Sequence, residues 1–358
     1  MAKYLEISEA LKKEIIGGVY EKEGKIPTEH ELVSRFSVSR QTIRQAIACL
    51  KNEGYLYQIQ GSGTYISNPS TSKRKKVNST PRVTVMCTYI SDYIFPSIIR
   101  GIENKLSSNG ISVNIVATSN RVEVERKILQ RIINDGDIDG LIVEGTKTGF
   151  PNPNIELYKE LDKLGIPYIF LHCSYPELLD KVTVGMKERE GGYQCIKKLI
   201  DMGCKTFGGI FKADDRQGLL RYKGFCEGLL DSSISLESAF VRWYTTEDLQ
   251  SESRFSLPLI KGFEEPDGIV CYNDQVALYI INHFRENKLP LPRIASFDQS
   301  HLCLLAPDSV YSIGHRKEEL GMVTAEKMIN MLKGKEEESQ YSSIGWFDLL
   351  SSTEFHFP

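Results

Sequence analysis

The sequence predicts an α/β protein of two similar strand–helix lobes, preceded by a small α+β domain with a helix–turn–helix and a hairpin. Three observations lead to this fold class. Helical periodicity and two short strands occupy residues 1–68, and the basic segment 69–81 holds a single large apolar residue. From 82 to 358, short apolar runs alternate with amphipathic helices. We therefore expect an N-terminal domain, a linker and a two-lobed domain with these boundaries.

Three helices are predicted in the N-terminal domain. Apolar residues recur at three- and four-residue steps over 4–16, which is typical of an amphipathic helix. Thr28 and Glu31 have the spacing of a capping box at the start of a second, short helix. Ser39 is expected to cap a third helix over 40–52.

A hairpin is predicted directly after the third helix. Apolar and β-branched residues favour strands at 56–59 and 64–66, and the intervening segment 60–63 is rich in glycine. A helix, a helix–turn–helix and a hairpin in this order are the elements of a winged-helix domain. Such a domain binds duplex DNA through the second helix of the helix–turn–helix.

The two lobes are predicted from seven apolar runs separated by helical patterns. The expected strands lie at 83–86, 113–116, 140–143 and 168–171 in the first lobe, and at 207–211, 268–272 and 294–297 in the second. Strands that alternate with helices form a parallel sheet with helices on both faces. Ligands of such proteins bind where the carboxyl ends of the strands of two lobes face each other.

Polar residues at the start of the third helix are candidates for DNA contact. Arg40 and Arg44 are four residues apart and therefore project from one helix face. Arginine pairs with guanine edges or with phosphates, and Gln41 and Thr42 are polar neighbours that add contacts. At the hairpin tip, the small segment of Gln60, Gly61 and Gly63 can enter a minor groove. The alternative is that these are ordinary solvent-facing residues.

Polar and aromatic residues also gather at the predicted strand ends. A sugar is neutral and rich in hydroxyl groups, so its site needs planar donors and acceptors together with aromatic faces. The candidate ligand contacts are Tyr93, Phe95, Glu144, Lys147, His172, Asp215, Arg221, Asn273 and Asp298. For each residue a structural alternative stays open, such as a helix cap for an aspartate or a satisfied core position for His172.

Composition excludes several other classes of protein. Residues 1–80 hold 13 of the 44 basic and 8 of the 47 acidic residues, so a basic head precedes an acidic body of 31 basic and 39 acidic residues. The eight cysteines form no CxxC pair, which predicts reduced thiols in a cytoplasmic protein without a metal site or cofactor. The charged N-terminal segment predicts no signal peptide, and no apolar run is long enough for a membrane span.

Two resemblances sharpen this interpretation. The segments IPTEHEL, FSVSRQTIRQAIACLKNEGYL and GSGTYI resemble the winged helix of the GntR family over residues 3–67. The segments DGLIVEGTK, GIPYIFLHCS, DDRQGLLRYKGF, CYNDQVA and SFDQS resemble LacI/GalR sensor domains, which are related to periplasmic sugar-binding proteins, over 82–335. The combination is most similar to the arabinose repressor group.

The resemblances imply a function and a set of site residues. They imply a repressor that leaves double-stranded operator DNA when a sugar, L-arabinose, binds. In the DNA-binding domain, Glu29 and His30 fall where the GntR family has a Glu-Arg pair. In the sensor, Arg221, Asn273 and Asp298 fall where LacI-type domains hold sugar hydroxyls. A homodimer is expected, because two heads at a fixed spacing are needed to read a two-fold operator.

Several departures and alternatives remain open. The segment before Asp298 is shorter than in LacI-type sensors and has Gln299 for the second aspartate, and the tail after 335 matches no known pattern. A glycoside-acting or aminotransferase-like enzyme is one alternative, but the sequence shows no recognisable nucleophile or cofactor motif. A transport binding protein conflicts with the DNA-reading head. An activator, or a sensor of another pentose or of a sugar phosphate, stays possible.

Overall fold

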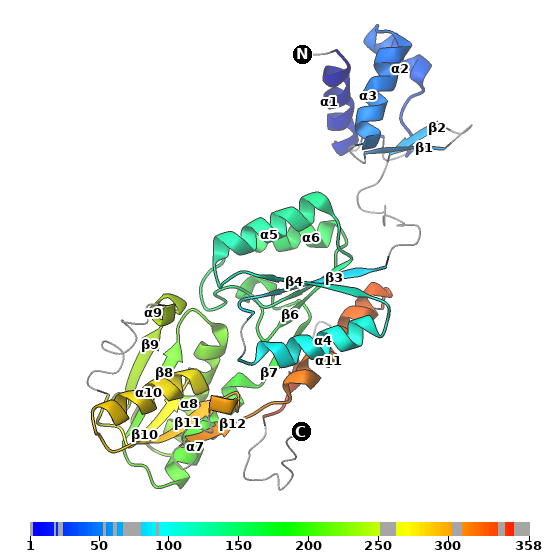
Figure 1. Cartoon of the computed structure of the whole chain (residues 1–358). Coiled ribbons are helices and arrows are strands. Elements are labelled where there is room, and N and C mark those ends of the chain that lie inside the picture. Colours follow the sequence, from blue (N-terminus) through cyan, green and yellow to red (C-terminus); the bar gives the residue numbers. More distant parts are fainter. Residues whose placement is uncertain are drawn as a thin grey trace. The chain divides into compact units, whose positions relative to one another are not determined.

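The chain divides into two compact units, each described here by itself (Figure 1). In this computed structural model the described residues are 3–17, 19–20, 24–52, 55–59, 63–66, 80–90, 93–250, 263–302, 310–335 and 341–346. The basic segment and most of the linker predicted at 69–81 lie outside these residues. None of the described helices is long and apolar enough to cross a membrane.

The first unit is a winged helix–turn–helix domain, as the sequence predicts. Its elements are α1 (Lys3–Ile16), α2 (Glu29–Phe36), α3 (Arg40–Asn52) and the antiparallel strands β1 (Leu56–Ile59) and β2 (Gly63–Ile66). One side of each helix packs into a single core, in which the side chains of Leu11, Leu32, Ile43 and Leu50 are fully buried. These positions follow the helical period of the sequence, so burial of one face accounts for the arrangement.

The second unit contains two lobes, each a parallel sheet between helices. The sheet of lobe 1 has the order β13-β7-β6-β5-β3-β4. Its elements are β3 (Arg82–Cys87), β4 (Ser112–Ala117), β5 (Gly140–Val143), β6 (Tyr168–Leu171), β7 (Thr183–Met186), β13 (Tyr341–Ile344), α4 (Phe95–Ser107), α5 (Val122–Asp135), α6 (Ile155–Lys163) and α11 (Lys317–Leu332). Alternate strand residues pack under α4 and α11 on one face, and under α5 and α6 on the other.

Lobe 2 repeats this architecture. Its sheet has the order β12-β11-β10-β8-β9. Its elements are β8 (Phe207–Lys212), β9 (Phe240–Tyr244), β10 (Gly268–Cys271), β11 (Arg293–Phe297), β12 (Val310–Ile313), α7 (Glu188–Asp201), α8 (Arg216–Asp231), α9 (Thr246–Gln250) and α10 (Asp274–Glu286). Helices α7 and α8 cover one face of the sheet, and α10 covers the other.

The predicted α/β class is confirmed and all seven predicted strands are present, but these seven do not complete the two sheets. Four strands were missed: β7 and β13 in lobe 1, and β9 and β12 in lobe 2. Strands β9, β12 and β13 lie at the edges of their sheets, and β7 lies between β6 and β13. Of the tail that matched no pattern, the described residues include β13, which pairs in parallel with β7 of lobe 1.

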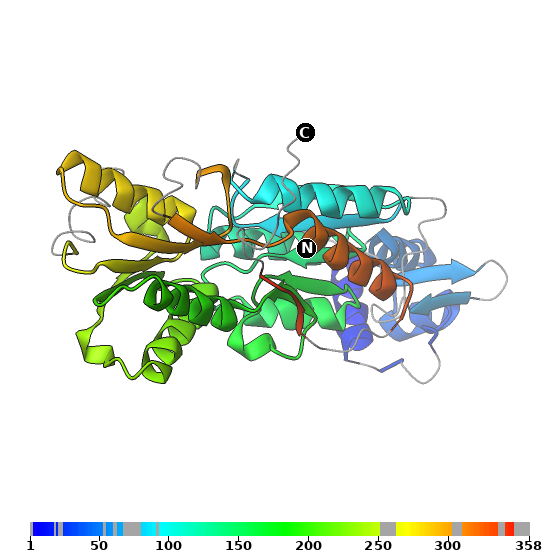
Figure 2. The same ribbon diagram turned by 90° about the horizontal axis from the view of Figure 1, so that it is seen from below.

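Close helix packing positions the pocket residues of lobe 2. A side chain on Gly192 of α7 would lie 2.0 Å from the backbone oxygen of Arg221, and one on Gly224 of α8 would lie 1.9 Å from that of Arg189. Glycine at both positions therefore lets the two helix backbones touch. In lobe 1, α4 and α11 lie side by side in the same way (Figures 1 and 2), with Gly101 and Gly321 at the contact.

Candidate functional site

The candidate DNA interface begins with a well-capped helix–turn–helix. Thr28 and Glu31 form the predicted capping box of α2. Ser37 ends that helix in the left-handed conformation, with φ of 51°, and so reverses the chain. The Ser39 Oγ then accepts a hydrogen bond of 3.1 Å from the Thr42 backbone N–H. The first turn of α3 is thus held in place by local side-chain contacts.

Glu29 holds both candidate DNA-reading arginines. Its carboxylate accepts from the Arg40 Nε at 2.8 Å and from the Arg44 Nε at 3.0 Å. Hydrogen bonding to Arg40, and then to Arg44, keeps the pKa of Glu29 below its usual value. The arginine side chains remain 70% and 62% exposed. Because each guanidinium meets Glu29 through its Nε, its two terminal nitrogens stay available for a phosphate or a base edge.

The other predicted DNA contacts come from α2, α3 and the hairpin. His30 and Gln41 are exposed on α2 and α3, and Thr42 is half-buried with its hydroxyl 2.8 Å from that of Ser39. Gly63 begins β2 with φ of +136°, which favours glycine, and a side chain there would strike Lys25. Gln60 and Gly61 lie outside the described residues.

Between the lobes lies a cavity of about 350 Å³ into which all nine predicted ligand contacts converge. Those residues are Tyr93, Phe95, Glu144, Lys147, His172, Asp215, Arg221, Asn273 and Asp298. Most of them follow the carboxyl ends of strands in both lobes, as expected for paired parallel sheets, and Phe95 and Arg221 lie on the helices α4 and α8. The volume is at the small end of the range for ligand pockets, which suits a small molecule.

Arg221 is the central charge of the cavity. It is only 2% exposed, and its Nε donates to the Glu188 Oε2 at 2.7 Å. One terminal nitrogen donates to the backbone oxygen of Tyr272, and the other lies 3.9 Å from the Asp298 Oδ1. Rings stack around the guanidinium, and that of Phe297 is closest at 4.1 Å. The cation is therefore neutralised and rigidly oriented before any ligand arrives.

Three other predicted contacts also have structural roles. Asn273 caps α10 by accepting from the Val276 N–H at 3.1 Å, and Asp215 caps α8. Asp298 has φ of +90° and accepts from the Tyr93 hydroxyl at 2.9 Å. A left-handed conformation in a residue other than glycine costs free energy and is typical of functional positions. The helix caps expected at Asp214 or Asp274 are instead formed by their neighbours Asp215 and Asn273, which line the cavity as well.

Two neutral histidines line the cavity with an unused ring nitrogen. The Nδ1 atoms of His172 and His315 are buried and have no hydrogen-bond partner. Burial lowers the pKa of His172 to about 4 and that of His315 well below its usual value. His172 is therefore not the satisfied core histidine that was the structural alternative. Uncharged rings with a free nitrogen suit hydroxyl groups, which both donate and accept.

Glu144 is a buried carboxyl group at the end of β5. Its Oε2 accepts from the backbone N–H of Thr88 and from the hydroxyl of the same residue. Burial nevertheless raises the pKa of Glu144 to about 7, because loss of solvent outweighs these hydrogen bonds. The group is therefore half protonated near neutral pH and acts both as donor and as acceptor.

This pKa predicts a pH-dependent stability that a Glu144→Gln variant removes. A carboxyl group whose pKa is higher in the folded state than in the unfolded state adds to the free energy of unfolding at low pH. This contribution is lost as the pH rises through the folded pKa. We expect the free energy of unfolding of wild type relative to the variant to fall by up to about 3 kcal/mol between about pH 5 and pH 7. Urea unfolding at several pH values measures it, and a flat or rising difference would contradict it.

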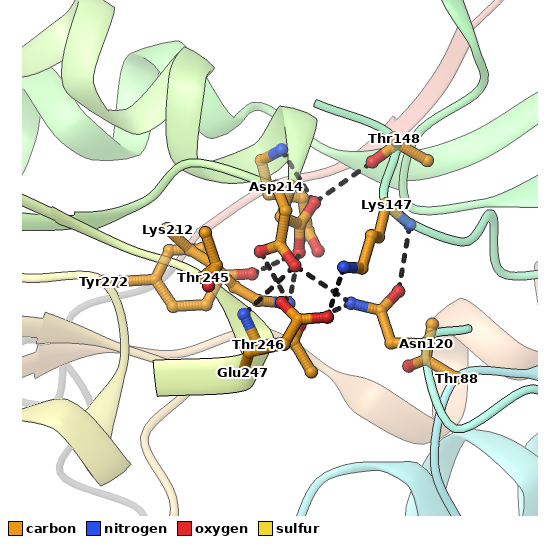
Figure 3. A network of polar contacts seen from close by, with 12 residues as sticks. Thr88, Asn120, Lys147, Thr148, Lys212, Asp214, Thr245, Thr246, Glu247 and Tyr272 are labelled. Atoms are coloured by element: carbon orange, nitrogen blue, oxygen red, sulfur yellow. Dashed lines mark hydrogen bonds and ion pairs between the residues drawn. The ribbon is translucent and has the colours of Figure 1, made fainter. Parts of the chain in front are cut away.

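A network of polar contacts, which we call the interlobe bridge, joins the two lobes beside the cavity (Figure 3). We use this name for Asn120, Lys147 and Thr148 of lobe 1 together with Asp214, Asp215, Thr246 and Glu247 of lobe 2. The Asn120 Oδ1 accepts from the Lys147 N–H at 2.9 Å, while its Nδ2 donates to the Thr246 hydroxyl and lies 3.4 Å from the Asp214 Oδ2. Lys147 pairs with Glu247, and Thr148 donates to Asp215.

Sequence reasoning missed Asn120, Lys212, Tyr272 and His315, all of which line the cavity. Lys212 is the last residue of β8 and Tyr272 follows β10, so both carry the same strand-end signal as the residues that were found. Asn120 follows β4 in the left-handed conformation, with φ of 52°, and His315 follows the undetected strand β12. The strand-end rule would have found the first two, whereas the last two needed the complete sheets.

Among the described residues, the charge of each cation of the cavity is balanced by at least one nearby carboxylate. Lys212 lies 3.7 Å from Asp214 and 3.9 Å from Asp215, and Lys147 and Arg221 pair with Glu247 and Glu188. A phosphate would need cations without such partners. The balance favours a neutral ligand with many hydroxyl groups.

Comparison with known proteins places both units. Residues 3–66 match the family of bacterial regulatory proteins of the gntR type, and residues 196–344 match the periplasmic binding protein-like domain. A DNA-binding head of the first type joined to a sensor of the second type defines a ligand-responsive bacterial transcriptional regulator.

Two similar relatives specify the family. The chain is 37% identical over 338 residues to an arabinose metabolism transcriptional repressor of Halalkalibacterium halodurans, covering 92% of this chain and 89% of that protein. It is 34% identical over 342 residues to an arabinose metabolism transcriptional repressor of Geobacillus stearothermophilus, covering 93% and 92%. The chain belongs to the family of arabinose metabolism transcriptional repressors. These relatives are regulators, so the enzyme alternative is excluded.

Solved structures confirm the sensor fold. A periplasmic binding protein/LacI transcriptional regulator from Alkaliphilus metalliredigens, complexed with D-xylulofuranose, has a TM-score of 0.63 and 19% identity, covering 75% of this chain and 96% of that one. The transcription regulator CcpA of Lactococcus lactis has a TM-score of 0.63 and 20% identity, covering 75% and 98%. At this identity the likeness concerns the fold alone.

Proposed function

We propose that the protein represses arabinose-utilisation genes as a cytoplasmic homodimer, and that L-arabinose in the interlobe cavity releases it from operator DNA. The observation that carries this proposal is the cavity itself. It is lined by all nine predicted residues, pairs each of its cations with a carboxylate, and contains two neutral imidazole rings whose buried Nδ1 atoms have no hydrogen-bond partner. The effector is assigned to L-arabinose because both relatives described above are named for arabinose metabolism.

On the DNA side, we propose that α3 enters the major groove. Arg40 and Arg44, oriented by Glu29, then reach base edges or phosphates from the first two turns of the helix, with Gln41 and Thr42 beside them. His30 contributes from α2, and Gln60, Gly61 and Gly63 from the wing. The functional boundaries follow as 1–68 for the DNA-binding domain, 69–81 for the linker and 82–358 for the sensor.

Coupling between the sites requires two arrangements of the lobes. Sugar that contacts Arg221 and Asp298 of lobe 2 together with Glu144 and His172 of lobe 1 stabilises one arrangement of the lobes over the other. Association of two chains through lobe 1 turns that change into a new spacing of the two DNA-binding heads. Such coupling is typically worth about 1–3 kcal/mol, or roughly 5- to 150-fold in operator affinity.

Titration of a DNA complex with sugars tests the proposal. A binding site is first selected from a random DNA pool with the purified full chain, and the complex is then titrated with L-arabinose, D-xylose, D-ribose and arabinose 5-phosphate. We expect L-arabinose to release the DNA and the phosphate ester to have no effect. Calorimetry of the sugar-free protein gives the affinity of each sugar. If saturating L-arabinose leaves DNA occupancy unchanged, the proposal is wrong.

A further inference from the structure

Trp346, just beyond β13, is near the cavity but is not among the residues that line it. Its ring is 5.3 Å from that of Phe297 and 5.7 Å from that of His315, and 5.6 Å from the Arg221 guanidinium carbon. Its indole N–H donates to the backbone oxygen of Lys187 at 3.0 Å, where the chain crosses from β7 to α7. The residue lies outside the matched sensor domain, which ends at residue 344.

The side chain packs against both lobes. It contacts the hydrophobic core under α4 and α11 in lobe 1, and the core under α7 and α8 in lobe 2. The preceding strand β13 is hydrogen-bonded to β7 of lobe 1, so the backbone belongs to one lobe while the ring reaches the other. Trp346 therefore connects the sheet of lobe 1 with the charge at the centre of the cavity.

A missing side chain on α7 makes room for the indole. A Cβ atom on Gly191 would lie 2.7 Å from the Trp346 Nε1 and 2.9 Å from the Phe297 Cε1. Glycine at this position lets the ring approach the first turn of α7, which begins at Glu188. That glutamate is the ion-pair partner of Arg221. The glycine that makes room for the indole and the carboxylate that pairs with Arg221 therefore lie in the same turn of α7.

We propose that Trp346 is a positioning residue of the sugar site, which holds the Arg221 guanidinium in place from the side away from the cavity. The inference rests on the proposed function, because it assigns the sugar contact to Arg221. A cation enclosed by the rings of Phe297, Tyr272 and Trp346 and by Glu188 has little freedom to turn. Removal of the indole takes away one of the rings that pack against the guanidinium, so we expect the arginine to lose its fixed orientation.

Two substitutions of Trp346, compared with wild type, test this role by calorimetry with L-arabinose. Trp346→Ala is expected to weaken binding by about tenfold or more, because a desolvated cation–π contact is lost and the arginine becomes mobile. Trp346→Phe keeps a ring beside the cation and is expected to retain affinity within about threefold. Trp243→Ala is the matched control, since that tryptophan of β9 is 38% exposed and packs on Phe211 and Tyr222 outside the cavity. It should leave the affinity unchanged.

A spectroscopic measurement separates positioning from a purely structural role. The chain has two tryptophans, so Trp243→Phe leaves Trp346 as the sole indole. We expect its emission to change on titration with L-arabinose, with the midpoint found by calorimetry. Thermal unfolding without sugar and binding to the selected DNA report the folding of each variant.

The outcomes are distinct. If wild type binds L-arabinose and Trp346→Ala binds it equally tightly, with or without a lower unfolding temperature, Trp346 has no positioning role and the proposed function stands. If the Trp346 fluorescence emission does not change at saturating L-arabinose, the inference is contradicted in the same way. If wild type itself binds neither L-arabinose nor another sugar of the panel, both the proposed function and this inference are wrong.

Discussion

Removal of the Arg221 side chain is expected to give a repressor that binds its operator normally and no longer responds to sugar. The guanidinium is the one cation of the described cavity that lies between carboxylates of α7 and of the strand end after β11, namely Glu188 and Asp298. Hydrogen bonds to a charged group contribute about 1.5–3 kcal/mol each, so loss of two should weaken sugar binding by at least about 100-fold. The DNA-binding head is a separate unit and keeps its structure.

The design of this variant has to take Glu188 into account. Arg221→Ala alone leaves a buried carboxylate without its partner, which typically costs about 3–5 kcal/mol of stability. Arg221→Met combined with Glu188→Gln removes both charges and keeps the volume filled. Operator binding with and without L-arabinose is then measured for single and double variants. A double variant that is folded and is still released by sugar would refute the assigned role of Arg221.

The second large effect is expected at the DNA interface. Arg44→Ala should weaken operator binding by about 1–3 kcal/mol, or roughly 5- to 150-fold, since an arginine contact to a base or phosphate is lost. Glu29→Gln should weaken binding less, because both arginines remain and lose only their common partner. Anisotropy titrations at several salt concentrations measure both. A phosphate contact lowers the salt slope by about one, whereas a base contact relaxes sequence preference at one position.

A matched charge control is available in the sensor. Arg131 on α5 is 78% exposed and pairs with Asp135, so Arg131→Ala removes the same charge far from the helix–turn–helix in sequence. This variant should bind operator like wild type. Equal affinities for Arg44→Ala and wild type would show that α3 does not dock through this residue.

Local patterns predicted most of the fold. Helix α3 and strands β5 and β6 have the bounds expected from the sequence, because caps and continuous apolar runs mark them. Strand β13 had no such mark. Its residues Tyr-Ser-Ser-Ile have no apolar run, and its pairing partner Thr183–Met186 lies more than 150 residues earlier in the chain. This segment becomes a strand because it pairs with the edge of β7, and a local sequence pattern does not reveal such a long-range contact.

The residues at strand ends that line the cavity could be predicted from local patterns, whereas residues whose role depends on contact between the lobes could not. Parallel strands end at one edge, so polar residues after β5, β6, β8 and β11 had to converge. Asn120 and Trp346 depend instead on how one lobe meets the other. An asparagine in a turn and a tryptophan after an undetected strand carry no sign of such a partner. Their roles become visible only when both lobes are placed together.

The interlobe bridge has a kinetic consequence. Asn120 and Lys147 join the lobes through Thr246 and Glu247. A sugar that enters by separation of the lobes has to wait until these contacts part, and the same contacts delay its departure. The speed of derepression would thus depend on how often the protein opens by itself, and at high sugar concentration the rate of entry would no longer increase with supply.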